Sequence, residues 1–77
     1  MVSEIDQYVI DKVRMLRQER GFSQSQLAFE MDMSTGFIAM IESGKYDKKY
    51  NISHLNKLAI ILQCSPQILL PDKPLTQ

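Results

Sequence analysis

The chain has 77 residues, of which 44% are hydrophobic and 23% are charged, and its formal net charge is zero. This length supports one domain, since single domains run to ~50–250 residues, and the composition excludes a disordered or collagen-like chain. One cysteine and one histidine exclude an internal disulfide and an ordinary zinc site, so we expect no metal and no other cofactor.

Apolar residues recur at helical spacing along almost the whole chain, and no stretch alternates with the period of two that is typical of a strand. The first predicted helix ends near Arg20, because Gly21 tolerates the left-handed backbone that closes helices. Its inner face is formed by Ile5, Val9, Val13 and Leu16.

A second helix is predicted from Gln24 to Met31. Ser23 and Gln26 have the spacing of a capping box, in which each side chain satisfies a free backbone N–H near the other residue. The inner face of this helix is formed by Leu27, Ala28 and Met31.

Three further helices are predicted in the rest of the chain. Ser34 caps a helix over residues 35–42, which Ser43 and Gly44 end. After a loop at 45–50, Asn51 caps a fourth helix, whose inner face is formed by Ile52, Leu55, Leu58, Ala59 and Leu62. Ser65 and Pro66 open a short fifth helix that continues through Leu70.

Residues 24–43 resemble the helix-turn-helix motif of phage Cro and repressor proteins, the Xre-type family. Two helices that cross at ~90–120° need a small residue where their backbones approach, and Ala28 supplies it. The other matching features are Gln24, Gln26, the turn at 32–34, Ile38, Ile41, Glu42 and Gly44. Where the family usually has Gly in the turn, this chain has Asp32, one of the few residues that adopt a left-handed backbone tolerably.

The resemblance extends over residues 9–70 and implies an all-α, lambda-repressor-like DNA-binding domain. We therefore expect five short helices in one helix-turn-helix domain, residues 1–72, with the motif at 24–43 and a C-terminal tail at 73–77.

The resemblance also assigns the residues that meet DNA. The base-facing positions of the recognition helix are Thr35, Gly36, Phe37, Ala39 and Met40. None is Arg, Asn or Gln, the residues that usually read bases, so we expect weak direct readout that relies on thymine methyl groups and DNA shape. The alternative is that Phe37 and Met40 form an apolar patch that binds protein.

The sequence offers more residues for contacts with the DNA phosphate backbone than for contacts with bases. Residues 45–57 contain four lysines and one aspartate, the only clearly basic stretch of the chain. The resemblance places phosphate contacts at Gln24, Ser34, Thr35, Ser43, Gly44 and Lys45, and the basic edge continues through Lys48 and Lys49. It also pairs Arg17 with Glu42, which fixes the recognition helix. We expect this pair to be mainly structural; the alternative is that Arg17 also lies near a phosphate.

Several side chains have simpler expected roles. We expect His54 to cap or lie at the surface, Cys64 to fill the core, and Tyr46 and Tyr50 to pack against the fourth helix; the alternative for the two tyrosines is that they stack on the loop or reach phosphates. The remaining charges of the first helix fit a solvated face. Large apolar residues fall outside the core faces: Ile10, Met15, Phe29 and Ile60. Because exposed apolar patches mark interfaces, Ile60 with Leu69 or Leu70 predicts a two-fold contact through the fourth and fifth helices, that is, a homodimer. The alternative is that the extended N-terminus folds back and covers some of these residues.

These features predict a sequence-specific regulator of double-stranded DNA, a repressor of phage or mobile-element type on an inverted-repeat operator. The alternative from another class is a protein-interaction module, or an antitoxin that binds both DNA and a toxin. No catalytic residues, and hence no enzyme activity, are expected. The longest apolar runs have five residues, against ~18 for a membrane span, and residues 1–6 are acidic, unlike a signal peptide. We therefore expect a cytoplasmic location and no membrane contact.

Overall fold

The computed structural model describes residues 1–76 and contains four α-helices and one short 3-10 helix. Their bounds are α1 Glu4–Glu19, α2 Gln24–Met31, α3 Thr35–Ser43, α4 Ile52–Leu62 and η1 Pro66–Leu69. The all-α prediction is confirmed, with one correction: the fifth helix is a four-residue 3-10 turn rather than an α-helix. Pro66 opens this segment, and Leu70, one residue before Pro71, has already become extended, so no room remains for a full α-helical turn.

Polar caps begin the helices at the residues that the sequence predicts. Ser23 and Gln26 form the capping box of α2: the Gln26 N–H donates to Ser23 Oγ at 3.0 Å, and the Ser23 N–H donates to Gln26 Oε1 at 2.7 Å. Asn51 and His54 form an equivalent pair at α4, so the capping role of His54 is confirmed. Ser34 caps α3 by accepting from the Phe37 N–H. Asp32 has φ 60°, the left-handed backbone that its place in the turn requires.

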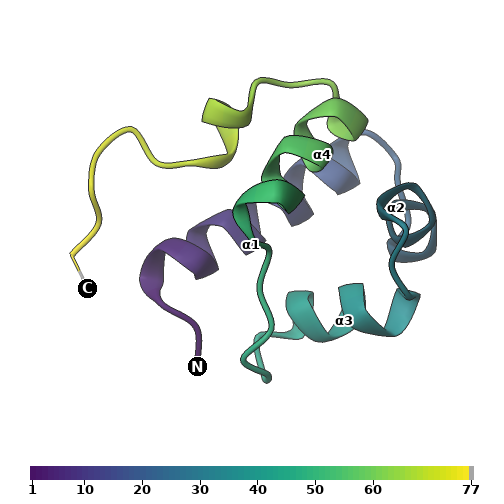
Figure 1. Cartoon of the computed structure of the whole chain (residues 1–77), viewed down its shortest axis with the longest axis horizontal. Helices are drawn as coiled ribbons and strands as arrows, with labels where there is room; N and C mark the ends of the chain where they lie inside the picture. Colours follow the sequence, from purple (N-terminus) through teal and green to yellow (C-terminus); the bar gives the residue numbers. More distant parts are fainter. Residues whose placement is uncertain (77) are drawn as a thin grey trace.

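One hydrophobic core lies between α1, α4 and the α2–α3 pair, and η1 closes its far end (Figure 1). The α3 helix lies on the opposite side of the molecule from η1 and the C-terminal segment. The side chains that are completely buried come from every element: Val13, Leu27, Ile38, Ile41, Leu58, Leu62 and Leu69. Cys64 packs against this core, as expected.

Four predictions about burial are wrong. Ile10 is buried rather than outward, because α1 is contacted by α3, α4 and η1 and therefore buries a wide arc of its surface. Two residues predicted on inner faces lie at the rim beside each other: Ile52, the first residue of α4, is 78% exposed, and Ile5 is 36% exposed. Tyr46 is exposed in the loop, whereas Tyr50 is buried as predicted.

Of the two residues expected to lie beside Ile60 at the dimer surface, Leu70 is exposed and Leu69 is not. Leu69 is completely buried in the core, so it is not available to a partner. Ile60 is 70% exposed, as predicted, and Ile68 and Leu70 are the apolar residues of the C-terminal segment that reach the surface. Met15 and Phe29 are also exposed, as predicted.

None of the helices in residues 1–76 combines the length and the apolarity that crossing a bilayer requires.

Candidate nucleic-acid interface

The α2–α3 pair has the packing of a helix-turn-helix. Ala28 is buried where the two helices approach, and Ile38 and Ile41 of α3 are completely buried in the wedge between them. The turn is closed by the Met33 N–H, which donates to the Ala28 carbonyl at 2.9 Å. A small residue at the crossing and two β-branched residues in the wedge thus fix the angle at which α3 is presented.

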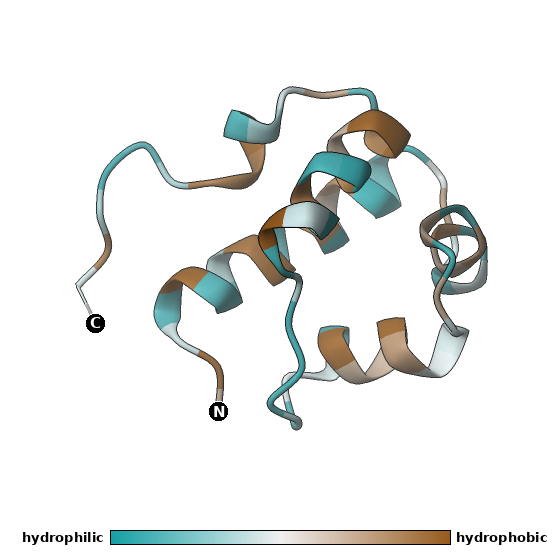
Figure 2. Cartoon of the chain, viewed as in Figure 1, coloured by the Kyte–Doolittle hydropathy of each residue, from teal (hydrophilic) through white to brown (hydrophobic). Residues whose placement is uncertain are grey.

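The outer face of α3 is apolar and carries no charge. Thr35 and Gly36 are exposed, whereas Phe37, Ala39 and Met40 are half-buried. The ring of Phe37 packs partly against the core, so only part of it reaches the surface. Figure 2 shows the contrast between α3, hydrophobic over most of its length, and the hydrophilic segment that leads to α4. Residues of this kind meet thymine methyl groups or other apolar surfaces rather than hydrogen-bonding groups of bases.

The start of α3 is also tied to α2. The Thr35 hydroxyl lies 3.3 Å from the Ser25 hydroxyl, which is exposed at the first turn of α2. Ser25 was not among the residues singled out from the sequence. Its link to Thr35 depends on the crossing of the two helices, which spacing along the chain does not reveal.

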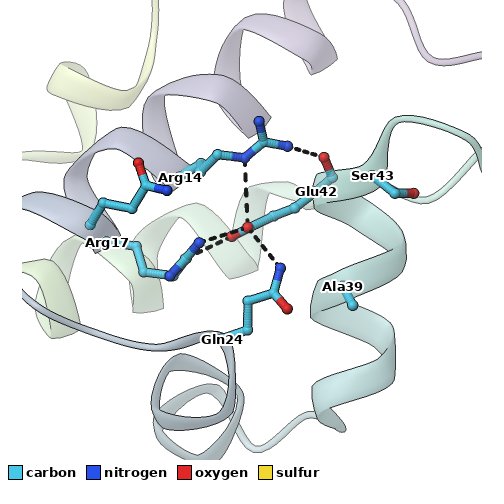
Figure 3. A pocket seen from close by; sticks show the side chains of 7 residues that line it. Arg14, Arg17, Gln24, Ala39, Glu42 and Ser43 are labelled. Atoms are coloured by element: carbon cyan, nitrogen blue, oxygen red, sulfur yellow. Dashed lines mark hydrogen bonds and ion pairs between the residues drawn. The ribbon is translucent and has the colours of Figure 1, made fainter.

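Glu42 is the centre of the largest polar network in the described residues (Figure 3). It is almost fully buried, and Arg17 binds both of its carboxylate oxygens: Nε donates to Oε2 at 2.8 Å and Nη2 to Oε1 at 2.9 Å. Arg17 also donates to the Phe22 carbonyl at 2.7 Å. Sequence analysis paired these two residues, and the structure brings them together across α1 and α3. The bidentate geometry holds the C-terminal end of α3 against α1.

Two further side chains reach Glu42 in the same network. Gln24 Nε2 donates to Glu42 Oε1 at 3.1 Å, and Arg14 Nε lies 3.6 Å from the same oxygen. Arg14 Nη2 also donates to the Glu42 carbonyl, in the last turn of α3. The side-chain amide of Gln24, predicted to face a phosphate, therefore faces the carboxylate in this structure. The sequence predicted that Arg14 lies on a solvated face of α1. Its spacing of three residues from Arg17 is the signal that could have placed both arginines on the same side of the helix.

Tyr50 packs beside this network from the core side. It is buried, its ring lies edge-on to His54 with centroids 6.2 Å apart, and its hydroxyl has no hydrogen-bond partner among residues 1–76. Burial, reinforced by the negative charge of Glu42, raises the pKa of Tyr50 well above its ordinary value. The hydroxyl therefore stays protonated throughout the physiological range.

The basic loop after α3 is exposed along residues 43–49. Gly44 has a left-handed backbone, φ 72°, and turns the chain away from α3. The Ser43 hydroxyl donates to the Met40 carbonyl at 2.9 Å and accepts from the Lys45 N–H at 3.3 Å, which shapes the start of the loop. Lys49 Nζ lies 3.3 Å from Asp6 Oδ2 of α1, and Asp47 contacts the amino group of Met1. Lys45 and Lys48 are exposed in the same segment.

The sequence profile of the helix-turn-helix family matches residues 13–69, and no curated protein matches the chain. Among solved structures, the restriction-modification controller protein C.AhdI from Aeromonas hydrophila is similar, with 27% identity and a TM-score of 0.68. The match covers 82% of this chain and 92% of that one. SinR, the master regulator for biofilm formation, in complex with DNA, has 24% identity and a TM-score of 0.67 over 79% of this chain and 95% of its own.

The same fold also forms part of a larger enzyme. Hydroxypropylphosphonic acid epoxidase from S. wedmorenis is similar over 90% of this chain, with 17% identity and a TM-score of 0.75, but the match covers 36% of that chain. At this identity the likeness shows the fold alone. The profile match, by contrast, spans the capped α2, the turn, the α3 wedge and the flanking helices. The chain belongs to the Xre-type helix-turn-helix family of DNA-binding transcription regulators.

Proposed function

We propose that this chain is a sequence-specific repressor that binds double-stranded DNA as a homodimer at an inverted-repeat operator, in the cytoplasm. The observation that carries the proposal is the Arg17–Glu42 pair, which fixes α3 so that Thr35, Gly36 and Ala39 form its outer face. Similarity to C.AhdI, a controller protein, and to SinR, whose structure contains DNA, supports it.

The proposed contacts divide by chemistry. The exposed start of α3 and the apolar side chains of Phe37, Ala39 and Met40 meet base edges and thymine methyl groups. Phosphates are met by Gln24 and Ser34 at the starts of α2 and α3, and by the loop with Ser43, Gly44, Lys45, Lys48 and Lys49. The Gln24 amide donates one N–H to Glu42 and keeps its second N–H for a phosphate. Because few basic residues are available, most sequence preference comes from the fit to thymine-rich, deformable sites rather than from bidentate hydrogen bonds.

The proposed dimer surface combines Ile60 of α4 with Ile68 and Leu70 of the C-terminal segment, all exposed. Exposed apolar residues of this size are costly on a small monomer and are typical of an interface. Light scattering at micromolar protein concentration should give the mass of a dimer, and Ile60→Glu should give a monomer. A monomeric mass for the unaltered chain would remove this part of the proposal.

The direct test of the function is selection from a random duplex library with purified protein, at low and at physiological salt. A two-fold-symmetric motif that is retained at physiological salt would support a dimeric operator-binding protein. Replacing Lys45, Lys48 and Lys49 with Glu should abolish this binding and lower the free energy of unfolding only slightly, because all three are exposed and the Lys49–Asp6 pair that is lost is worth less than ~1 kcal/mol. Enrichment of no motif, with binding lost as salt rises, would contradict the proposal.

The second candidate is a protein-binding role, such as that of an antitoxin. The observation that favours it is Phe29 on α2, which is 82% exposed and belongs neither to the core nor to the outer face of α3. Under this reading, Phe29→Ser should weaken partner binding without changing the affinity for DNA.

A further inference from the structure

The cleft between α1 and α3 carries a positive charge that its one carboxylate does not neutralise. Its lining includes two guanidinium groups, Arg14 and Arg17, and one carboxylate, Glu42. Arg17 binds both oxygens of Glu42 at 2.8 and 2.9 Å, so this pair is satisfied internally. Arg14 Nε is 3.6 Å from Glu42 Oε1, outside good hydrogen-bonding distance. The uncompensated charge is therefore that of Arg14.

Arg14 is also the arginine that solvent and ligands can reach. Its side chain is 40% exposed, whereas that of Arg17 is 9% exposed. A guanidinium has five N–H donors in a planar fork, and Arg14 uses one of them on the Glu42 carbonyl. That bond orients the guanidinium and leaves its other N–H donors free of the Glu42 carbonyl. Donors remain for a second acceptor, and a planar fork of this kind binds phosphate oxygens well.

The rest of the cleft is uncharged and opens beside the proposed DNA-reading helix. Ala39 and Ser43 line one wall and lie one helical turn apart on α3; Gln24 of α2 and Gln18 of α1 line the others. Ala39 lines the cleft and also belongs to the proposed outer face of α3, so the cleft adjoins that face (Figure 3). Small and amide side chains leave space in front of Arg14 that a tetrahedral anion fits.

We infer that Arg14 binds one phosphodiester group of the DNA backbone, which enters this cleft as α3 approaches the duplex. The inference rests on the proposed function. It makes α1, whose Arg17 was expected to be mainly structural, a further element that contacts DNA, beside α3, the start of α2 and the basic loop. A phosphate held here lies next to the Arg17–Glu42 pair, so its position is coupled to that of the C-terminal end of α3.

Salt dependence of DNA binding measures this contact directly. The slope of log affinity against log salt is ~0.9 per neutralised phosphate, so Arg14→Gln should reduce its magnitude by ~0.9. Arg14→Lys keeps the charge and should retain the slope of the unaltered chain. Lys12→Gln is the matched control: it removes one positive charge from the same helix, and Lys12 lies over the Tyr8 ring on the side that faces η1. This control should retain the slope.

The outcomes separate the inference from the function on which it rests. Equal slope changes in Arg14→Gln and Lys12→Gln would show a general charge effect and overturn the inference. An unaltered slope in Arg14→Gln would leave Arg14 a structural clamp on α3 and also overturn it, with DNA binding intact. Absence of DNA binding by the unaltered chain would remove both.

A free anion is distinguished by a second measurement. Inorganic phosphate is titrated into the unaltered protein without DNA, and the amide resonances of Gln24 and Ser43 are followed. We expect no saturable shift at physiological concentrations, because free phosphate lacks the other contacts that a duplex makes. Saturation at such concentrations, lost in Arg14→Gln, would assign the cleft to free phosphate and overturn the DNA assignment.

Discussion

Arg17 and Glu42 lie 25 residues apart in the sequence and form a buried, bidentate ion pair, with both N–O distances below 3 Å. The pair joins the last turn of α1 to the end of α3, and the Phe22 carbonyl accepts from the same guanidinium. One arginine therefore connects the long first helix, the segment before α2 and the helix that is proposed to read DNA. Such a pair holds α3 in one orientation, but it contributes little net stability, because both charges are desolvated.

Removing only Arg17 from the pair should lower the free energy of unfolding clearly. Arg17→Ala leaves Glu42 buried without its main counter-charge, and we expect the free energy of unfolding to fall by about 3 kcal/mol. Arg14 and Gln24, which also reach Glu42, keep the loss at the lower end of the usual range. Chemical denaturation at neutral pH measures the change.

The double variant Arg17→Ala with Glu42→Gln is the control. It removes the stranded charge and should recover part of the lost stability, whereas Glu42→Gln alone should destabilise. An unfolding midpoint for Arg17→Ala equal to that of the unaltered chain would contradict the structural role of the pair.

Tyr50→Phe tests the buried hydroxyl that has no partner. At neutral pH the substitution should leave stability unchanged or raise it slightly, because an unsatisfied polar atom leaves the core. The Tyr50 pKa is raised in the folded protein, so the unfolded chain loses this proton first, near its ordinary pKa of about 10. Tyr50 therefore costs the folded protein no stability through ionisation below about pH 10, and it lowers the free energy of unfolding as the pH rises above that value.

Urea midpoints at about pH 8 and about pH 11 give the comparison. The unaltered chain should lose more stability across this interval than Tyr50→Phe does. The Tyr46→Phe variant is a matched control, since Tyr46 is exposed and should behave as the unaltered chain does. Parallel pH profiles for the unaltered chain and Tyr50→Phe would contradict the assignment.

Much of this architecture follows from local signals. The caps at Ser23, Ser34 and Asn51 each satisfy free N–H groups within three residues, so the starts of three helices could be predicted from neighbouring residues alone. The left-handed backbone of Asp32 is equally local.

Burial and polar networks could not be predicted in the same way. Helical spacing gives the direction of a side chain but not how many elements contact the helix, so the burial of Ile10 under several neighbours was missed. The position of Arg14 depends on where the end of α3 lies in space, because its acceptor is the Glu42 carbonyl. That information is carried by the fold rather than by spacing along the chain.

Asp32 gives a test of the turn between α2 and α3. An L-residue in the left-handed region costs roughly 1 kcal/mol relative to Gly, and the short polar side chain of Asp lowers this cost. Asp32→Gly should therefore change stability by less than ~1 kcal/mol, with a gain in the folded state offset by the flexibility of unfolded Gly. Asp32→Val, a β-branched residue, should destabilise the domain by at least ~1–2 kcal/mol. Thermal unfolding of the three proteins ranks them; a Val variant as stable as the Gly variant would contradict the strain argument.

The contact between Lys49 and Asp6 limits what the loop contributes to DNA binding. Lys49 Nζ is 3.3 Å from Asp6 Oδ2, so a phosphate must compete with this carboxylate for the ammonium group. Asp6→Asn removes the competitor and should raise the affinity for DNA at low salt, by an amount below ~1 kcal/mol, the usual worth of an exposed pair.

Asp11→Asn is the matched control, because Asp11 is an α1 carboxylate that accepts from Gln7 and, within residues 1–76, contacts no loop lysine. In a Lys49→Gln background the effect of Asp6→Asn should shrink to that of the control. An equal gain from both aspartates in the unaltered background would show that net charge alone, rather than release of Lys49, sets the affinity.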